Sequence, residues 1–331
     1  MATWKSILRE LDAANKRMVR EAERQQRLAL REQALLQKQD ELFRAELEVE
    51  EFNERMSQLT TIHHDVGETL DWNEIVNLEP PSFPSADCSA ERKALRMLNR
   101  YRPTWLQRLF GQVENKRREL EKNVAQAKLL DGYNNQKAIE QYDSAMEQWS
   151  QLHQMAVSIN QGQLSAYQQA ILEINPLSEI QEMGGEIRFS VPDSITVITT
   201  ILVDGEKIVP RQIKTLTSRG KLSVKAMPKT KAYEVYEDFV CGCALRTARE
   251  LFAILPIACT VVHIEMPLLD QATGYTTNCT ILSVVIHRSI LEQINISATD
   301  SSEAIKLFPH RVKFARTKGF SAVQPLSLSD C

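Results

Sequence analysis

The stretch LALREQALLQKQDELFRAELEVEEFNERMSQL, residues 28–59, decides the architecture of the first part of this chain. It holds no glycine or proline, and the first such residues in the chain are Gly67 and Pro80. Its apolar residues recur in a heptad pattern, which is typical of coiled-coil helices. We therefore expect one long helix whose seam binds a partner, because an isolated amphipathic helix is only marginally stable in water. The predicted partner-binding seam residues are Leu28, Leu35, Leu42, Val49, Phe52, Met56 and Leu59.

Upstream of this stretch the apolar residues follow a second frame. Its members are Trp4, Leu8, Leu11, Met18, Ala22 and Ala29. A change of frame within one helix is typical of a stutter, which locally unwinds a supercoil without ending the helix. The helix is expected to end between residues 61 and 67.

Charge is divided along the predicted helix. Residues 1–31 hold eight basic and four acidic residues, and residues 32–60 hold three basic and eight acidic residues. Two antiparallel copies would place each basic half beside an acidic half, which favours self-association. Three alternatives remain open: a different helical partner, a solvated face packed on the chain's own domain, and nucleic-acid binding by the basic half.

Length and composition indicate a protein of about two domains. The chain has 331 residues, a net charge of −3 and 25% charged residues. Six scattered cysteines suit a reducing compartment better than a disulfide framework. No apolar run is long enough to span a bilayer, and no signal-peptide core is visible, so we expect a cytoplasmic protein. The expected organisation is a coiled-coil arm (1–66), a proline-containing linker (67–90), a helical region (91–180) and an α+β domain (181–331).

The helical region begins with a basic segment. Residues 91–128 hold eleven basic and four acidic residues, and an aromatic turn, YRPTWLQRLFG, occupies residues 101–111. An amphipathic turn covering the helical region is the favoured interpretation, and contact with anionic lipid or nucleic acid is the alternative. A second heptad seam follows at residues 138–159, with an interruption expected near Gly132. The two helical arms are then able to pair with each other within one chain.

The C-terminal part shows strand periodicity. Alternating and β-branched runs at residues 187–191 and 195–203 precede Asp204-Gly205, a strong hairpin signal. A helix is expected over residues 230–255, and two further strands, residues 258–265 and 279–287, form a predicted second hairpin. This order predicts an α+β domain in which an antiparallel sheet packs against helices.

Few residue patterns in the chain indicate catalysis. Cys241 and Cys243 are two apart on a predicted helix, where their side chains diverge, so metal or redox chemistry is not favoured. His263 and Glu265 share one face of a predicted strand, and His287 belongs to the adjacent one. Asp204, Glu206 and Lys207 resemble a nuclease arrangement only superficially. We therefore expect neither a cofactor nor a metal, and enzymatic activity is the least favoured interpretation.

Two groups of basic residues are candidates for nucleic-acid contact. Residues 310–320, HRVKFARTKGF, combine four basic residues with two phenylalanines. The candidates are Arg108, Lys116, Arg117, Arg118, Arg311, Lys313, Arg316 and Lys318.

Four short blocks resemble uncharacterised bacterial proteins that contain coiled coils. These blocks are YEVY at residues 233–236, LFAILP at 251–256, ATGY at 272–275 and ILSVVI at 281–286. The resemblance covers roughly residues 100–320 and implies a bacterial, cytoplasmic protein, but no activity. The sequence thus predicts a non-enzymatic scaffold that binds itself or another protein through coiled-coil helices and recognises a partner with its α+β domain. A nucleic-acid-binding component of a bacterial stress or phage-defence system is the alternative.

Overall fold

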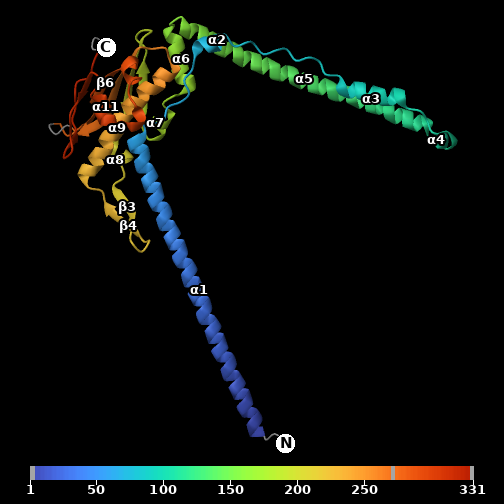
Figure 1. Ribbon diagram of the computed structural model, residues 1–331, viewed down its shortest axis with the longest axis horizontal. Helices are drawn as coiled ribbons and strands as arrows, with labels where there is room; N and C mark the ends of the chain where they lie inside the picture. The colour runs from blue at the N-terminus through green and yellow to red at the C-terminus, as the bar shows by residue number, and fades with distance from the viewer. Residues whose placement is uncertain (1–3, 270–272, 329–331) are drawn as a thin grey trace. The chain divides into compact units, whose positions relative to one another are not determined.

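The computed structural model describes residues 4–269 and 273–328, without the side chains of residues 4–29, 34 and 206. The chain forms two compact units. Unit 1 comprises residues 1–68, 175–253 and 257–331, and unit 2 comprises residues 69–174 with 254–256. Figure 1 shows the elements of both. The described fold is α+β, as the sequence predicts.

Unit 1 begins with the long helix that the absence of glycine and proline predicts. Helix α1 runs without a break from Trp4 to Thr61. Its last turn contains Thr60 and Thr61, whose hydroxyls donate to backbone carbonyls one turn earlier, at Met56 and Ser57. Such back-bonding slightly weakens a helix, and Gly67 lies just beyond, so the helix ends inside the predicted window.

The α+β part of unit 1 is built on a five-stranded sheet in the order β1-β2-β5-β6-β7. Its strands are Glu186–Ser190, Thr196–Leu202, Cys259–Leu269, Thr276–His287 and His310–Val312. The predicted second hairpin is present as β5 and β6. The expectation of a wholly antiparallel sheet is wrong, because β2 and β5 pair in parallel. The chain between them crosses over through helix α9 (Lys229–Ile254), which lets β5 run in the same direction as β2.

The turn predicted at Asp204-Gly205 is also different in the structure. Instead of reversing the chain into a second strand, these residues start the short helix α8 (Gly205–Ile208), and the carbonyl of Asp204 accepts hydrogen bonds from the amides of Lys207 and Ile208. Antiparallel strands β3 (Gln212–Leu216) and β4 (Leu222–Ala226) then form a separate hairpin, and helix α9 spans Lys229–Ile254.

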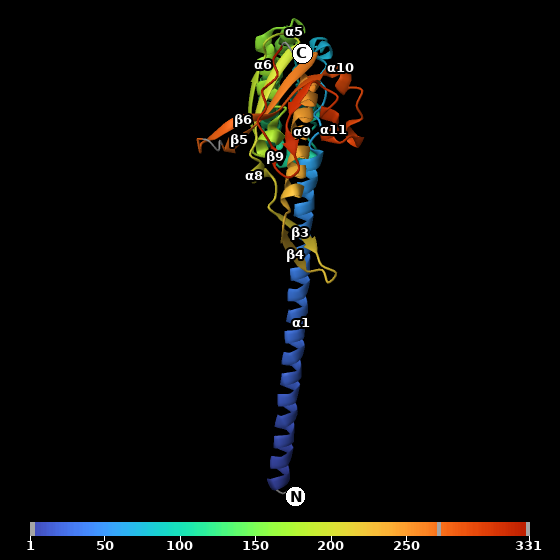
Figure 2. The same cartoon turned by 90° about the vertical axis from the view of Figure 1, so that its left-hand side faces the viewer.

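The remaining elements of unit 1 are short. They are α7 (Ser178–Glu182), α10 (Arg288–Leu291), the 3-10 helix η1 (Ile296–Ala298), α11 (Ser301–Ile305), β8 (Phe314–Ala315) and β9 (Gly319–Phe320). The core lies between the central strands and α9, whose ribbons Figure 2 shows from a second side. Its fully buried side chains include Phe239, Leu245, Leu251, Ile201, Ile264 and Ile286.

Unit 2 is helical. Its helices are α2 (Trp72–Val76), α3 (Ser89–Arg100), α4 (Trp105–Leu109), α5 (Val113–Asn160) and α6 (Leu164–Ile174). Contrary to expectation, α5 continues through Gly132, where a glycine costs only about 1 kcal/mol within a 48-residue helix. The linker lies along α5: the Trp149 indole donates to the Leu78 carbonyl at 3.1 Å, and the Phe83 and Tyr142 rings meet edge-on. The seam at residues 138–159 is therefore covered in part by the linker of its own unit.

Candidate interaction surfaces

The C-terminal part of α1 packs on its own domain. Ala45 is 5% exposed, Leu59 is fully buried, and Leu42, Val49, Phe52 and Met56 are half-buried. The β3–β4 hairpin covers this face: a Cβ placed on Gly220 would lie 2.9 Å from a methyl of Leu42. An ion pair of 3.0 Å joins Lys214 of β3 to Glu48. The structure therefore packs the C-terminal part of the predicted seam, residues 42–59, against the chain's own domain.

Where its side chains are described, the opposite face of α1 is uncovered. Leu36 and Phe43 are 56% and 67% exposed, and Leu47 is also exposed. Leu36 lies nine residues from Ala45, and Phe43 nine from Phe52, a separation of about 2.5 turns that puts each pair on opposite sides of the helix. We call Leu36, Phe43 and Leu47 the free face of α1.

The free face continues the upstream frame of the sequence. Ala22, Ala29, Leu36 and Phe43 follow one another at intervals of seven residues. The upstream frame therefore does not stop where the seam of residues 28–59 begins, and between residues 28 and 47 the two occupy different sides of the same helix. Sequence reasoning missed Leu36, Phe43 and Leu47, although extending the upstream frame by two heptads reaches the first two. Of the predicted seam residues, Leu35 is exposed, and the side chain of Leu28 lies outside the description.

The end of α1 is fixed to α9. Arg246 donates to the Ile62 carbonyl at 3.1 Å, and Arg249 donates to the carbonyls of His63 and His64. Arg246 also forms a buried ion pair of 3.0 Å with Glu250. These charged hydrogen bonds satisfy the carbonyls of the turn, residues 62–64, that directly follows the helix.

Gly242 explains the Cys-Gly-Cys triplet of α9. A Cβ on Gly242 would lie 2.7 Å from Ile62. The end of α1 is able to approach α9 this closely because residue 242 has no side chain. Cys241 and Cys243 are buried, and burial raises the pKa of both thiols well above its ordinary range. They are packed side chains, and no cluster of three or more histidine, cysteine or carboxylate side chains suited to a metal occurs among the described residues.

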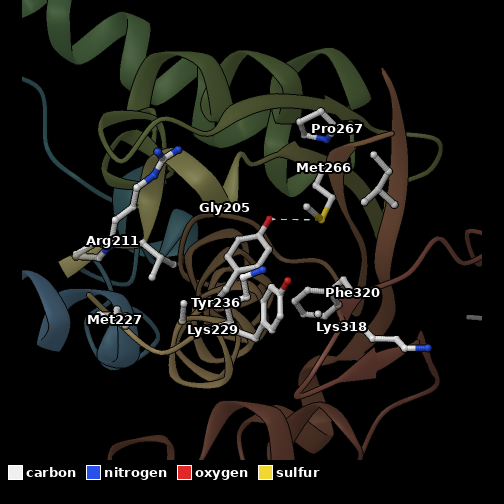
Figure 3. Close-up of a pocket in the computed structure, with 15 residues that line it drawn as sticks. Gly205, Arg211, Met227, Lys229, Tyr236, Met266, Pro267, Lys318 and Phe320 are labelled. Carbon is white, nitrogen blue, oxygen red and sulfur yellow. Dashed lines mark hydrogen bonds between the residues drawn. The ribbon is translucent and has the colours of Figure 1, made fainter. Parts of the chain in front are cut away.

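A cavity of about 450 Å³ opens beside the start of α9 (Figure 3). Its walls include Tyr233 and Tyr236 of α9, Met227, Met266 of β5 and Phe320 of β9. This volume lies within the range of small-molecule and side-chain pockets. Arg211, Lys229 and Lys318 add positive charge, and Figure 3 shows the charged ends of Arg211 and Lys318 pointing away from the Tyr236 ring. The apolar centre with a cationic edge suits an apolar group with a negative charge near it.

Tyr236 shapes the cavity. Its hydroxyl points toward the Met266 sulfur at 3.9 Å, and its ring meets Phe320 edge-on with centroids 5.6 Å apart. A Cβ on Gly205 would lie 2.7 Å from this ring, so the first residue of α8 must be a glycine. Burial raises the pKa of Tyr236 far above its usual value, so the side chain stays a neutral phenol.

In unit 2 the predicted aromatic turn projects into solvent. Helix α4 lies where α3 and α5 meet, at one end of that pair (Figure 1). Trp105, Leu109 and Phe110 are 72%, 70% and 68% exposed, and Leu106 is also exposed. The favoured expectation, that Trp105, Leu109 and Phe110 cover the helical region, is wrong, because all three side chains are exposed. We call Trp105, Leu106, Leu109 and Phe110 the α4 tip.

The candidate nucleic-acid residues are scattered over both units. In α5, Lys116, Arg117 and Arg118 form ion pairs with Glu119, Glu121 and Glu114 at 2.7, 3.3 and 3.9 Å. Arg108 is an exposed residue of α4.

The C-terminal candidates of unit 1 are divided among different contacts. Arg311 donates to the Pro325 carbonyl, Arg316 pairs with Glu234 at 3.7 Å, Lys318 lines the cavity, and Lys313 is exposed. The segment that carries them forms β7, β8 and β9 rather than a solvated tail.

The candidate acid–base residues each have a different partner. His263 Nδ1 is 2.8 Å from the Ser283 hydroxyl across the β5–β6 pair, and that hydroxyl accepts from the Leu326 amide. Glu265 forms an ion pair of 2.8 Å with Arg188. His287 lies opposite Cys259 in the register of β5 and β6, at the other end of these strands. Burial lowers the pKa of His263, and the Glu265 charge opposes this. These contacts tie β1, β6 and the C-terminal segment together.

The nuclease-like group is likewise local. Lys207 of α8 pairs at 3.1 Å with Asp204, the residue that precedes this helix, and the Glu206 side chain lies outside the description.

Comparisons with protein-family models, with curated proteins and with solved structures found no match. Of the helices described, none is both long and apolar enough to cross a membrane.

Proposed function

We propose that this protein is a non-enzymatic cytoplasmic scaffold that associates with a second copy through the free face of α1 and recognises a partner with its α+β domain. The observation that carries the proposal is the two-sidedness of α1. One face is packed on unit 1, and the opposite face leaves Leu36, Phe43 and Leu47 in water. An apolar row at heptad spacing on a long helix is the geometry that a second helix covers in a coiled coil.

Charge favours a second copy in the antiparallel orientation. Residues 1–31 carry a net charge of +4 and residues 32–60 a net charge of −5. Opposed basic and acidic halves attract each other in the antiparallel arrangement, whereas a parallel arrangement places like charges side by side. The buried thiols of Cys241 and Cys243 are free, which supports a reducing compartment.

The cavity supports the second part of the proposal. Its aromatic and methionine walls offer an apolar site able to take one or two side chains of a partner segment, and methionine adapts to varied shapes. Its cationic edge favours a segment with acidic residues beside the apolar ones. Nucleic-acid binding is less well supported, because the α5 candidates are paired with glutamates and so offer phosphate less net charge.

Light scattering of the full chain tests the association. We expect the mass of a dimer for the wild type and of a monomer for L36Q/F43Q, which removes the apolar row without changing the charge. The matched control Q33A/Q37A changes two other positions of the same stretch and is expected to remain dimeric. Because Leu36 and Phe43 are more than half exposed, the thermal unfolding of a diluted sample should be the same for all three proteins. A monomeric wild type, or a dimeric L36Q/F43Q, would refute the proposal.

A further inference from the structure

The α4 tip is a rigidly built feature rather than a loose loop. Thr104 and Gln107 form a capping box, in which the Gln107 side-chain oxygen accepts from the Thr104 amide at 3.1 Å. The same oxygen accepts from the Tyr101 hydroxyl at 3.1 Å. At the other end Gly111 adopts a φ of 67°, and the Gln112 amide donates to the Gln107 carbonyl at 3.0 Å. This is a helix termination that glycine permits, and it holds Leu109 and Phe110 outward.

The surroundings of the tip are uniformly cationic. Between residues 92 and 113 the chain has six basic residues and no acidic one. Arg100, Arg102 and Arg108 flank the tip and are exposed, and none forms an ion pair or side-chain hydrogen bond with another residue in the described part of the chain. At the start of α5, Lys116, Arg117 and Arg118 are paired with glutamates, whereas Arg100, Arg102 and Arg108 leave their positive charge unpaired beside the tip.

We propose that the α4 tip docks this protein on the surface of an anionic lipid bilayer. Trp105, Leu109 and Phe110 would enter the boundary between headgroups and acyl chains, where tryptophan is favoured and apolar side chains are removed from water. Arg100, Arg102 and Arg108 would lie against the phosphates of anionic headgroups. The site lies on the membrane and does not span it.

A bilayer fits this surface better than a protein does. The tip is one short projecting helix of five residues, and a specific protein interface needs about 20–30 residues on each side. A fluid bilayer needs no matching shape. Nucleic acid would satisfy the arginines and stack on Trp105, but it would leave Leu106 and Leu109 in water.

Vesicle co-sedimentation of the full chain tests the proposal. Vesicles of phosphatidylcholine with phosphatidylglycerol are expected to bind the wild type, and phosphatidylcholine alone to bind it at least tenfold less. Raising salt should weaken the binding. W105A/F110A and R102Q/R108Q should each lose at least tenfold in partitioning. The control L129A/Y133A removes two equally exposed apolar side chains of α5 and should bind as the wild type does.

Two results would overturn the proposal. One is an absence of binding to anionic vesicles at low salt, and the other is unchanged binding by W105A/F110A, which would mean adsorption by charge alone. A single-stranded oligonucleotide provides the third arm: binding that needs Trp105 there, without vesicle binding, would assign the tip to nucleic acid instead. Circular dichroism melts of all variants should coincide, because the substituted side chains are exposed.

Discussion

At the scale of single residues, the packing of α9 against the end of α1 depends on Gly242. A Cβ there would lie 2.7 Å from Ile62 and 3.4 Å from His63, both buried at the end of α1. We expect Gly242→Ala to destabilise unit 1 by about 1–3 kcal/mol, because a buried contact must shift to admit the methyl group. Urea unfolding followed by circular dichroism measures the change.

Gly132 provides a matched control for that substitution. It lies within α5, and a Cβ on it meets no atom within 4 Å. Gly132→Ala is expected to stabilise unit 2 by about 0.5–1 kcal/mol, since alanine restricts the unfolded chain and favours helix. If Gly242→Ala also stabilises its unit, the close packing of α1 against α9 is wrong.

Asp238 of α9 links stability to pH. Burial, and then the neighbouring carboxylate of Asp300, raise its pKa to about 6. The folded state therefore holds this proton more tightly than the unfolded chain does. Stability is lost as pH rises from about 4 to about 6, and the loss persists above that window.

Asp238→Asn should remove this loss. We expect the variant to exceed the wild type in unfolding free energy by ~1 kcal/mol at pH 7.5, after allowance for solvent screening, and to match it below pH 4. Denaturant unfolding across this pH range is the measurement. Asp40→Asn, at an exposed position of α1, controls for the loss of one negative charge and should show no such pH-dependent gain. An equal gain at all pH values would show that Asp238 acts by something other than its charge.

At the scale of elements, α3 depends on one side chain of α5. The buried Asp131 carboxylate accepts from the amides of Ala90 and Glu91, at 3.3 and 2.8 Å, and so satisfies two first-turn donors of α3. We expect Asp131→Ala to cost unit 2 about 1–2 kcal/mol and to speed amide exchange in α3. Asp131→Asn should recover part of the loss, and Asp143→Ala, at an exposed position of α5, should have little effect. Unchanged exchange in α3 with Asp131→Ala would contradict this role.

Sequence reasoning reached the type of most elements but not their pairing. The absence of glycine and proline predicts α1, and the apolar face of residues 230–255, which Pro256 ends, predicts α9. The parallel pairing of β2 with β5 could not be predicted, because strand periodicity does not record direction. The cavity joins Gly205, Tyr236 and Phe320, which are distant in sequence and carry no shared motif.

The surfaces of α1 and α4 show a second limit of sequence reasoning. A heptad pattern identifies apolar faces but not what covers each of them. The pattern therefore predicts a partner for the seam between residues 42 and 59, whereas the structure places the β3–β4 hairpin there. The same limit applies to residues 101–111, where an amphipathic pattern is compatible with a covered or an exposed apolar side. The exposure of Trp105 and Phe110 required the structure.

At the scale of the whole molecule, different parts of α1 have different roles. Residues 42–63 complete unit 1, since Leu59, Ile62 and His63 are buried and the Ile62 carbonyl accepts from Arg246 of α9. The part of the helix before residue 36 holds the earlier members of the upstream heptad frame, which continues into Leu36 and Phe43 of the free face. A single helix therefore serves as part of the domain core and, in our proposal, as the means of association.

Two truncations separate these roles and are expected to have opposite consequences. Removing residues 1–34 leaves the packed face complete, so unit 1 should unfold at the same temperature as the unit in wild-type protein diluted to a monomer. The truncated chain should nevertheless be monomeric, because fewer than the three or so heptads that a coiled coil requires remain on the free face. Removing residues 1–66 instead exposes the apolar surface of α9 that Ile62 covers, and leaves Arg246 and Arg249 without the carbonyls they bind. That chain should lose cooperative unfolding or aggregate. Light scattering and thermal unfolding of both truncations decide the matter: a stable, well-folded protein lacking residues 1–66 would mean that α1 is a separate arm rather than part of unit 1.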